Sequence, residues 1–376
     1  MLDQVRERLA RDSAPVSPQL VARALREQGR PVGDATVLAV HDALVRDVAG
    51  AGPLEPLLRL PGVTDVLVNG PDRVWFDRGD GLEPSRVGFP DDEAVRRLAQ
   101  RLAAAAGRRI DDAAPYADVR LPDGTRFHAV LAPLSRPGTL LSLRVPRRRA
   151  FTLAELQRAG TVTTEGARLL ARLVTRRRAF LVSGGTGTGK TTVLDALLSL
   201  VDPAERIVLV EDSSELRPHH PHAVGLEARP PNLEGAGEVT VRTLVRQALR
   251  MRPDRLVVGE VRGGEVVDLL AALNTGHEGG CGTIHANSAG DVPSRVEGLA
   301  LAAGLNREAT HSQLSSALDA VVHLDRRRGG RRLAQVGVLE RDRSGRVTVR
   351  TAVWFDDAGR MVEGPGAGVL GDLVGS

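Results

Sequence analysis

Lysine is almost absent from this chain. Of the 51 lysine and arginine residues in the 376-residue sequence, 50 are arginine and one, Lys190, is lysine. That lysine ends the glycine-rich stretch GGTGTGK, residues 184–190. Because arginine has replaced lysine everywhere else, we expect position 190 to have a role that arginine cannot fill.

Cysteine and long apolar runs are also scarce. The one cysteine, Cys281, excludes an internal disulfide framework and fits a reducing cytoplasm. No apolar run approaches the ~18 residues that suggest a membrane span. The N-terminal stretch MLDQVRERLARDS is charged and lacks the apolar segment of a secretory signal. We therefore expect a cytoplasmic protein.

Aromatic residues make up only 2% of the chain, which leaves few surfaces on which nucleic-acid bases could stack. The net charge is +4, and arginine clusters such as residues 326–328 could meet phosphates or acidic lipid. A solvated surface is the favoured interpretation of these clusters. Direct binding to nucleic acid is not expected.

The rest of the composition, 42% apolar and 26% charged residues, is typical of globular proteins, and the length favours two or three domains. Residues 1–50 have apolar side chains at helical spacing. Short β-like runs follow, with a PDG hairpin turn at 122–124. Strands then alternate with helices, which predicts a mainly parallel sheet. The expected parts are a helical segment (1–50), an α+β domain (51–146), a linker with a short helix (147–160), an α/β domain (161–360) and a flexible tail (361–376).

Residues 184–191, GGTGTGKT, fit the phosphate-binding P-loop pattern G-x-x-x-x-G-K-[ST]. The stretch follows a strand-like AFLVS and precedes a helix with an apolar stripe, so its context is that of a P-loop. Lys190 should reach the β- and γ-phosphates of ATP, and the Thr191 hydroxyl should hold Mg²⁺. The alternative is a glycine-rich turn with an incidental lysine. The predicted nucleotide-binding residues are Gly185, Thr186, Gly187, Thr188, Gly189, Lys190, Thr191 and Thr192.

The shape of the two basic groups explains why this lysine persists. An ammonium group is a compact point charge that fits inside a tight loop of backbone donors. The planar guanidinium fork of arginine is wider and rigid. The sequence therefore predicts that arginine at position 190 would not replace Lys190.

Two acidic residues come at the ends of predicted strands. Glu211, followed by Asp212, ends IVLV, and Glu260 follows RLVVG with Gly259 where many P-loop proteins carry a metal-binding aspartate. Ligands of open α/β sheets gather at the carboxyl ends of the strands. We expect Glu260 to orient the attacking water and to contact Mg²⁺ through water, and Glu211 to support the metal and the water network. Solvated strand ends are the alternative.

Two histidines bracket glycine-rich turns in TGHEGGCGTIHANS. His285 ends a strand expected beside the P-loop strand, so its imidazole could sense the γ-phosphate by a hydrogen bond. His285 is favoured over His277 for this role. Cys281 is expected to be a small buried side chain without thiol chemistry.

These stretches, in this order, resemble the P-loop, Asp box, Walker B and His box of the type II/type IV secretion and pilus-motor ATPases. The boxes are GGTGTGKTT, IVLVEDSSEL, RPDRLVVGEVRGGE and TGHEGGCGTIHAN. GPLEPLLRLPGVTDVLVNGPDRVWFDR and DVRLPDGTRFHAVLAP are similar to the N-terminal domain of the tight-adherence (Tad) pilus branch, which is close to the conjugal-transfer ATPases. The resemblance covers roughly residues 45–340. Gly280, Cys281 and Gly282 depart from it, because small hydroxyl residues are common there.

The resemblance implies a RecA-like P-loop domain after a smaller PAS-like α+β domain, and assembly into a hexameric ring. Such a motor uses ATP and Mg²⁺ at the inner face of the plasma membrane, where it drives an inner-membrane platform. Arginines of the N-terminal domain reach the γ-phosphate in this family. The matching residues are Arg126 and Arg144, with Arg120 a weaker candidate. Arg262 could bridge to a neighbouring protomer.

Three other functions compete with a motor. An ATP-dependent switch or scaffold with little turnover would fit the missing Walker B aspartate, but not the set of Glu211, Glu260 and His285. A small-molecule kinase would need a lid, and no arginine-rich insertion lies between the boxes. A DNA-transfer ATPase is disfavoured by the scarce aromatic residues.

Overall fold

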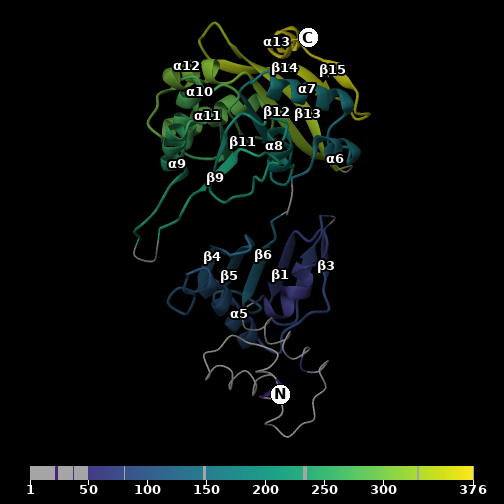
Figure 1. Cartoon of the computed structure of the whole chain (residues 1–376), viewed down its shortest axis with the longest axis vertical. Helices are drawn as coiled ribbons and strands as arrows, with labels where there is room; N and C mark the ends of the chain where they lie inside the picture. The colour runs from purple at the N-terminus through teal and green to yellow at the C-terminus, as the bar shows by residue number, and fades with distance from the viewer. Residues whose placement is uncertain are drawn as a thin grey trace. The chain divides into compact units, whose positions relative to one another are not determined.

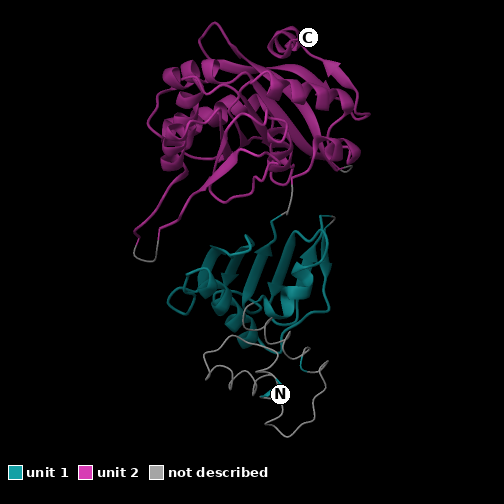
Figure 2. Ribbon diagram, viewed as in Figure 1, with its two compact units in different colours: residues 1–148 teal, residues 149–376 magenta. Residues whose placement is uncertain are grey.

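The computed structural model describes residues 22–23, 37, 50–79, 81–146, 150–231, 235–327 and 330–375. The chain divides into two compact units, Met1–Arg148 and Arg149–Ser376 (Figure 2). The helices expected within residues 1–50 fall almost wholly outside the described residues. In the described ranges, no helix is both long and apolar enough to cross a bilayer.

Unit 1 is built on a six-stranded antiparallel sheet with the order β3-β2-β1-β6-β5-β4 (Figure 1). The expected turn at 122–124 joins β4 to β5, and Asp123 accepts a hydrogen bond from the Thr125 backbone amide. The strands are β1 (Asp65–Asn69), β2 (Val74–Asp77), β3 (Leu82–Pro84), β4 (Tyr116–Arg120), β5 (Arg126–Val130) and β6 (Leu140–Arg144). The helices are η1 (Gly52–Leu54), α4 (Glu55–Leu58) and α5 (Asp92–Ala105).

Helix α5 covers the core of unit 1 because its apolar residues form one stripe. Asp91 caps its first turn by accepting a hydrogen bond from the Ala94 amide. The stripe meets the alternating inward residues of the central strands, such as Phe127 of β5 and Leu141 of β6. Unit 1 therefore has the α+β composition that the sequence predicted.

Unit 2 is built on a nine-stranded sheet with the order β15-β14-β13-β12-β7-β11-β10-β8-β9 (Figure 1). The strands from β12 to β9 in this order pair in parallel, and the strands from β15 to β12 pair antiparallel. The first six strands are β7 (Phe180–Gly184), β8 (Ile207–Glu211), β9 (Ala223–Glu227), β10 (Arg255–Val261), β11 (Cys281–His285) and β12 (Ala320–Arg327). The last three are β13 (Gly330–Arg341), β14 (Val347–Phe355) and β15 (Met361–Glu363).

Helices cover both faces of this sheet, as the predicted alternation of strands and helices requires. One face packs on α6 (Leu153–Arg158), α7 (Thr164–Thr175), α8 (Lys190–Leu198) and α13 (Ala367–Val374). The other face packs on α9 (Val241–Ala248), α10 (Glu265–Leu273), α11 (Val292–Ala302) and α12 (Arg307–Ala317), with the short η2 (Leu249–Met251) and η3 (Ala289–Asp291). The core beneath α6, α7, α8 and α13 is called the first core, and the core beneath α9 to α12 is called the second core. Strand β7 is buried on both sides, since Phe180 and Val182 lie in the first core and Leu181 lies in the second.

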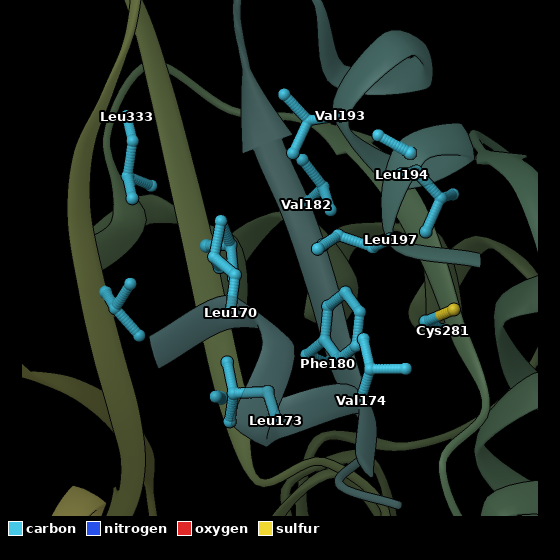
Figure 3. Close-up of a cluster of buried hydrophobic side chains, with 14 of the residues drawn as sticks. Leu170, Leu173, Val174, Phe180, Val182, Val193, Leu194, Leu197, Cys281 and Leu333 are labelled. Atoms are coloured by element: carbon cyan, nitrogen blue, oxygen red, sulfur yellow. The ribbon is translucent and has the colours of Figure 1, made fainter. Parts of the chain in front are cut away.

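The first core fixes the strand and the helix that flank the P-loop. Phe180 and Val182 of β7 lie against Leu170 and Leu173 of α7 and beside Leu197 of α8 (Figure 3). Strands β7, β8, β10 and β11 all run in parallel, so the segments that follow them leave the sheet at one edge. The predicted P-loop, Glu211, Glu260 and His285 belong to this edge.

Two expectations about the ends of unit 2 differ from the structure. Residues 361–376 do not form a flexible tail, because they contain β15 and α13, and Leu370 and Val374 are buried in the first core. Glycine-rich composition is overridden here by two apolar residues at helical i, i+4 spacing. Part of the expected linker also belongs to unit 2, since Leu156 of α6 packs into the same core.

The packing of α13 can be tested by substitution. Leu370 is 3% exposed and Val369, its neighbour on the same helix, is 41% exposed. Leu370→Ala should lower the free energy of unfolding by about 2–5 kcal/mol, because it leaves a cavity in the core. Val369→Ala should change it by less than about 0.5 kcal/mol. Urea unfolding of both variants measures the difference, and equal effects would show that α13 does not pack as described.

Candidate active site

The loop between β7 and α8 has the backbone conformation of a phosphate-binding loop. Gly187 (φ 72°) and Gly189 (φ 92°) adopt the left-handed region, where other residues are strained. A Cβ at Gly184 would lie 2.5 Å from the Leu324 carbonyl oxygen, so a side chain is excluded there as well. Helix α8 begins at Lys190, and its N-cap Gly189 makes no side-chain cap. No side chain therefore caps the amides of the first turn, which leaves them available to an anion.

The Lys190 ammonium is held inside this loop. Its Nζ donates to the carbonyl oxygens of Gly184 (3.1 Å) and Gly185 (2.9 Å) and lies 3.3 Å from Nε2 of His285. The side chain is buried, and desolvation lowers the pKa of Lys190, opposed by the charges of Glu260 and Glu215. A desolvated cation at the mouth of a glycine loop is a site for an anion.

His285 links Lys190 to Glu260. The same His285 nitrogen, Nε2, lies 3.1 Å from Oε1 of Glu260 and 3.3 Å from the ammonium. Burial, followed by the charge of Lys190, lowers the pKa of His285, which favours the neutral ring. A neutral ring can accept at Nε2 from Lys190 or donate from Nε2 to Glu260, but not both at once. The structure thus brings together three of the four predicted catalytic residues.

Glu211, the fourth predicted catalytic residue, is held differently. Its carboxylate is buried and accepts hydrogen bonds from the backbone amides of Glu215 and Leu216, both at 3.0 Å. A Cβ at Gly259 would lie 2.6 Å from Cγ of Glu211. The Glu211 side chain therefore fills the space beside β10 that a side chain at position 259 would need, which accounts for glycine at that position.

A second buried carboxylate, Asp195 of α8, completes a clamp on the loop after β8. Asp195 accepts a hydrogen bond from the backbone amide of Arg217 at 2.8 Å, next to the two amides bound by Glu211. Burial raises the pKa of Asp195 to about 6 and that of Glu211 to about 7. The clamp connects α8, which begins at the P-loop, to the segment that follows β8.

The other predicted site residues of unit 2 lie in less central positions. His277 donates from Nδ1 to the Ala272 carbonyl oxygen (3.2 Å), so it serves the end of α10. Arg262 forms an ion pair with Asp212 (2.6 Å) within the chain. Cys281 is buried in the first core, and burial raises the pKa of its thiol to about 12. Thr191 and Thr192 are half-buried in the first turn of α8.

Unit 1 brings its three predicted arginines into one row. Arg126 of β5 pairs in register with Arg120 of β4 on one side and with Arg144 of β6 on the other. Residues directly opposite each other project on the same face of a sheet. Arg126 also forms an ion pair with Asp118 (2.9 Å), and Arg144 lies 3.9 Å from Asp65. Their contact with the γ-phosphate stays a prediction.

The sequence matches the profile of the type II/IV secretion system protein family over residues 47–346. The chain belongs to this family. A Mycobacterium tuberculosis (strain H37Rv) protein named for conjugal transfer is 56% identical over 352 residues, which cover 92% of this chain and 99% of that protein. The type IV secretion system protein PtlH of Bordetella pertussis is 34% identical over 317 residues, which cover 77% and 93% of the two chains.

A solved structure supports the fold of this secretion-family protein. The pilus retraction motor PilT has a TM-score of 0.52 and 18% identity, and the match covers 83% of this chain and 82% of PilT. The predicted α/β architecture, a RecA-like P-loop domain preceded by a smaller N-terminal domain, is thereby confirmed.

The secretion-family site fits a nucleotide and Mg²⁺. Only the Thr188 methyl group comes within 4 Å of a Cβ added at Gly185, at 3.9 Å, so the loop is open there. The described residues contain no group of three His, Cys, Asp or Glu side chains that could hold a metal ion. A P-loop Mg²⁺ needs less from the protein, because a hydroxyl such as that of Thr191, phosphate oxygens and water complete its shell.

Sequence reasoning missed several residues of this site. The negative charge of Glu215 acts on Lys190, although only the strand-end acids of EDSSEL were singled out. Asp195 of α8 is not among the predicted site residues. Buried His323 of β12 lies 2.9 Å from the Ser183 hydroxyl of β7 through its Nδ1, directly before the P-loop. Each of these interactions joins residues distant in sequence, so no short sequence pattern predicts it.

Gly259 provides a test of the Glu211 packing. Gly259→Ala should lower the free energy of unfolding by about 1–3 kcal/mol, because the new methyl group overlaps the buried Glu211 side chain. Gly298→Ala in α11 is the matched control, since an added Cβ there meets nothing within 4 Å. The control should be neutral or stabilising by up to about 1 kcal/mol. Urea unfolding compares the two, and a fully stable Gly259→Ala protein would contradict the packing.

The raised pKa of Glu211 predicts a pH dependence of stability. Its pKa is about 7 in the folded protein against an ordinary value of 4.5, so the folded state holds this proton more tightly. The resulting stabilisation, about 3 kcal/mol, is full below the unfolded pKa and is lost as the pH rises through 7. In urea unfolding without nucleotide or Mg²⁺, wild type should therefore lose stability relative to Glu211→Gln between about pH 4 and pH 8.

Exposed Glu308 of α12 supplies the control for that series. Glu308→Gln should keep the wild-type dependence of stability on pH, because it leaves the buried Glu211 carboxyl in place. An unchanged dependence in Glu211→Gln would show that burial does not raise the pKa of Glu211.

Proposed function

We propose that this protein is an ATP-hydrolysing motor that powers pilus assembly or protein secretion of the Tad type. The observation that carries the proposal is the continuous contact from the P-loop ammonium of Lys190 through His285 to Glu260. A loop that only binds phosphate does not need a carboxylate linked to its lysine. Membership of the type II/IV secretion system family supports a role in secretion.

The geometry supports a sequence of events at Lys190. When Nζ turns from the carbonyl oxygens of Gly184 and Gly185 to phosphate oxygens, it also leaves Nε2 of His285. Nε2 can then carry the proton and donate to Glu260, which fixes the carboxylate for orienting a water. Phosphate binding thus changes the hydrogen bond of His285, and this change fixes the position of the Glu260 carboxylate. Bound Mg²⁺, held by the Thr191 hydroxyl, would neutralise charge on the β- and γ-phosphates.

The arginine row of unit 1 is the part of that unit that the resemblance to secretion ATPases assigns to the γ-phosphate. The three arginines lie in register on neighbouring strands, and Arg126 and Arg144 also lie near Asp118 and Asp65 of the same unit. We propose that Arg126 and Arg144, with Arg120 beside them, meet the γ-phosphate. The motor would act as a hexameric ring on an inner-membrane platform, at the cytoplasmic face of the plasma membrane.

A DNA-transfer ATPase is the second candidate. The M. tuberculosis relative named for conjugal transfer is matched over 92% of this chain, which favours it. The small number of aromatic residues argues against direct handling of single-stranded DNA. Stimulation of turnover by single-stranded DNA would favour this candidate over the secretion motor.

Two variants of the full chain test ATP hydrolysis. Glu260→Gln should bind ATP like wild type and lose about 100-fold or more in turnover, because the water loses its orienting carboxylate. Lys190→Arg should lose ATP binding or turnover despite its charge, since the guanidinium does not fit the loop. Equilibrium ATP binding and steady-state phosphate release are measured on the same preparations. Near-wild-type turnover of Glu260→Gln would favour a switch or scaffold, and a fully active Lys190→Arg would refute the steric argument.

A further inference from the structure

A basic hairpin borders the P-loop on the side away from His285. The hairpin is formed by β12 and β13, and Nε of Arg331 donates to the Gly187 carbonyl oxygen at 2.9 Å. A Cβ at Gly187 would lie 3.6 Å from Nη1 of Arg326, and one at Gly189 would lie 3.4 Å from Cδ of Arg331. Two guanidinium groups therefore flank two glycines of the phosphate loop.

Both arginines project on the face of the sheet that carries α8. Arg326 and Arg331 are direct cross-strand partners, two residues beyond the Leu324–Leu333 pair. Leu324 and Leu333 are buried in the first core with the side chains of α8. Because side chains alternate along a strand, the arginine pair continues this face towards the start of α8.

The opposite face of the hairpin differs in charge balance. Arg327 and Arg332 are neutralised there by Asp325 and Asp357, with Arg332 lying 3.1 Å from each. In the described ranges of the chain, no carboxylate oxygen lies within 4.0 Å of Arg326 or Arg331. Like charges directly opposite each other are destabilising. A bound anion would therefore stabilise the pair, and the described residues supply none within that distance.

We propose that Arg326 and Arg331 bind the phosphates of the nucleotide from the β12 side of the P-loop. This inference rests on the proposed function and adds the second wall of the same site. Strand β7 lies between β12 and β11, and Glu260 and His285 lie on the β11 side. The γ-phosphate belongs beside those catalytic residues. The arginines therefore hold the inner phosphates, which ATP and ADP share, and Arg331 also positions the loop through Gly187.

Contacts to shared phosphates have a distinct kinetic signature. An interaction that is equal in the ground state and the transition state lowers KM without raising kcat. Loss of either arginine should therefore weaken the binding of ATP and the binding of ADP by the same factor. The turnover of the saturated enzyme should stay the same. If the arginines instead acted on the γ-phosphate, their loss would lower kcat and would weaken the binding of ATP more than that of ADP.

The experiment compares five variants of the full chain, one of which is a control. Arg326→Gln and Arg331→Gln should each raise Kd for ATP and for ADP about tenfold, and their combination should raise both further, with kcat within about twofold of wild type. Arg326→Lys should recover part of the lost affinity, because it keeps the charge. The matched control is Arg327→Gln combined with Arg332→Gln, which changes the opposite face and should leave both Kd values unchanged. Titration calorimetry gives Kd, phosphate release gives kcat and KM, and thermal unfolding verifies the fold.

The outcomes separate this inference from the proposed function. Wild-type affinity in the Arg326→Gln and Arg331→Gln proteins would overturn the inference and leave ATP hydrolysis standing. An equal loss in the control would overturn it too, because hairpin integrity would then explain the effect. If the variants keep nucleotide affinity but lose binding to phosphatidylglycerol vesicles, the pair is a membrane contact and the inference is wrong. A wild-type protein that binds no nucleotide would refute both.

Discussion

The site depends on a single buried cation. The Lys190 ammonium is largely removed from water, and a buried charge is costly unless its donors are satisfied. Two acceptors come from its own loop and the third from His285, which pairs in register with Gly184 across β7 and β11. The parallel pairing thus delivers the imidazole at the level where the loop begins. One of the three acceptors of the Lys190 ammonium is therefore His285, the residue that also contacts Glu260.

Space beside β10 is the second constraint. Many P-loop proteins carry a carboxylate at the position that corresponds to Gly259. In this protein the carboxyl group next to that position belongs to Glu211 of the neighbouring strand β8. The Glu211 side chain of β8 can occupy this region only because Gly259 of the neighbouring strand β10 has no side chain. Glu211 and Asp195 then hold three successive amides of the loop after β8. The Glu211 carboxyl is buried at this place, and the loss of solvent raises its pKa.

The sequence predicted the features that depend on residues close to one another in the chain. The P-loop, the β4–β5 turn and the α/β alternation depend on glycine, turn residues and apolar periodicity, all of which are visible in short windows of sequence. The proximity of Lys190, His285 and Glu260 also follows, since parallel strands end at one edge. The Asp195–Arg217 and Ser183–His323 contacts could not be predicted, because they depend on tertiary packing. The side of the hairpin on which Arg326 projects depends on the register of β12 and β13, and the sequence alone does not fix it.

The burial of Cys281 makes the chain a clean background for site-directed labelling. Its thiol is 1% exposed within a packed core and has a pKa of about 12, so very little reactive thiolate forms near neutral pH. A cysteine introduced at an exposed position of each unit would therefore carry the only reactive thiols. Fluorophores or spin labels attached to them would report interdomain distances before and after nucleotide is added, with no native thiol to remove first.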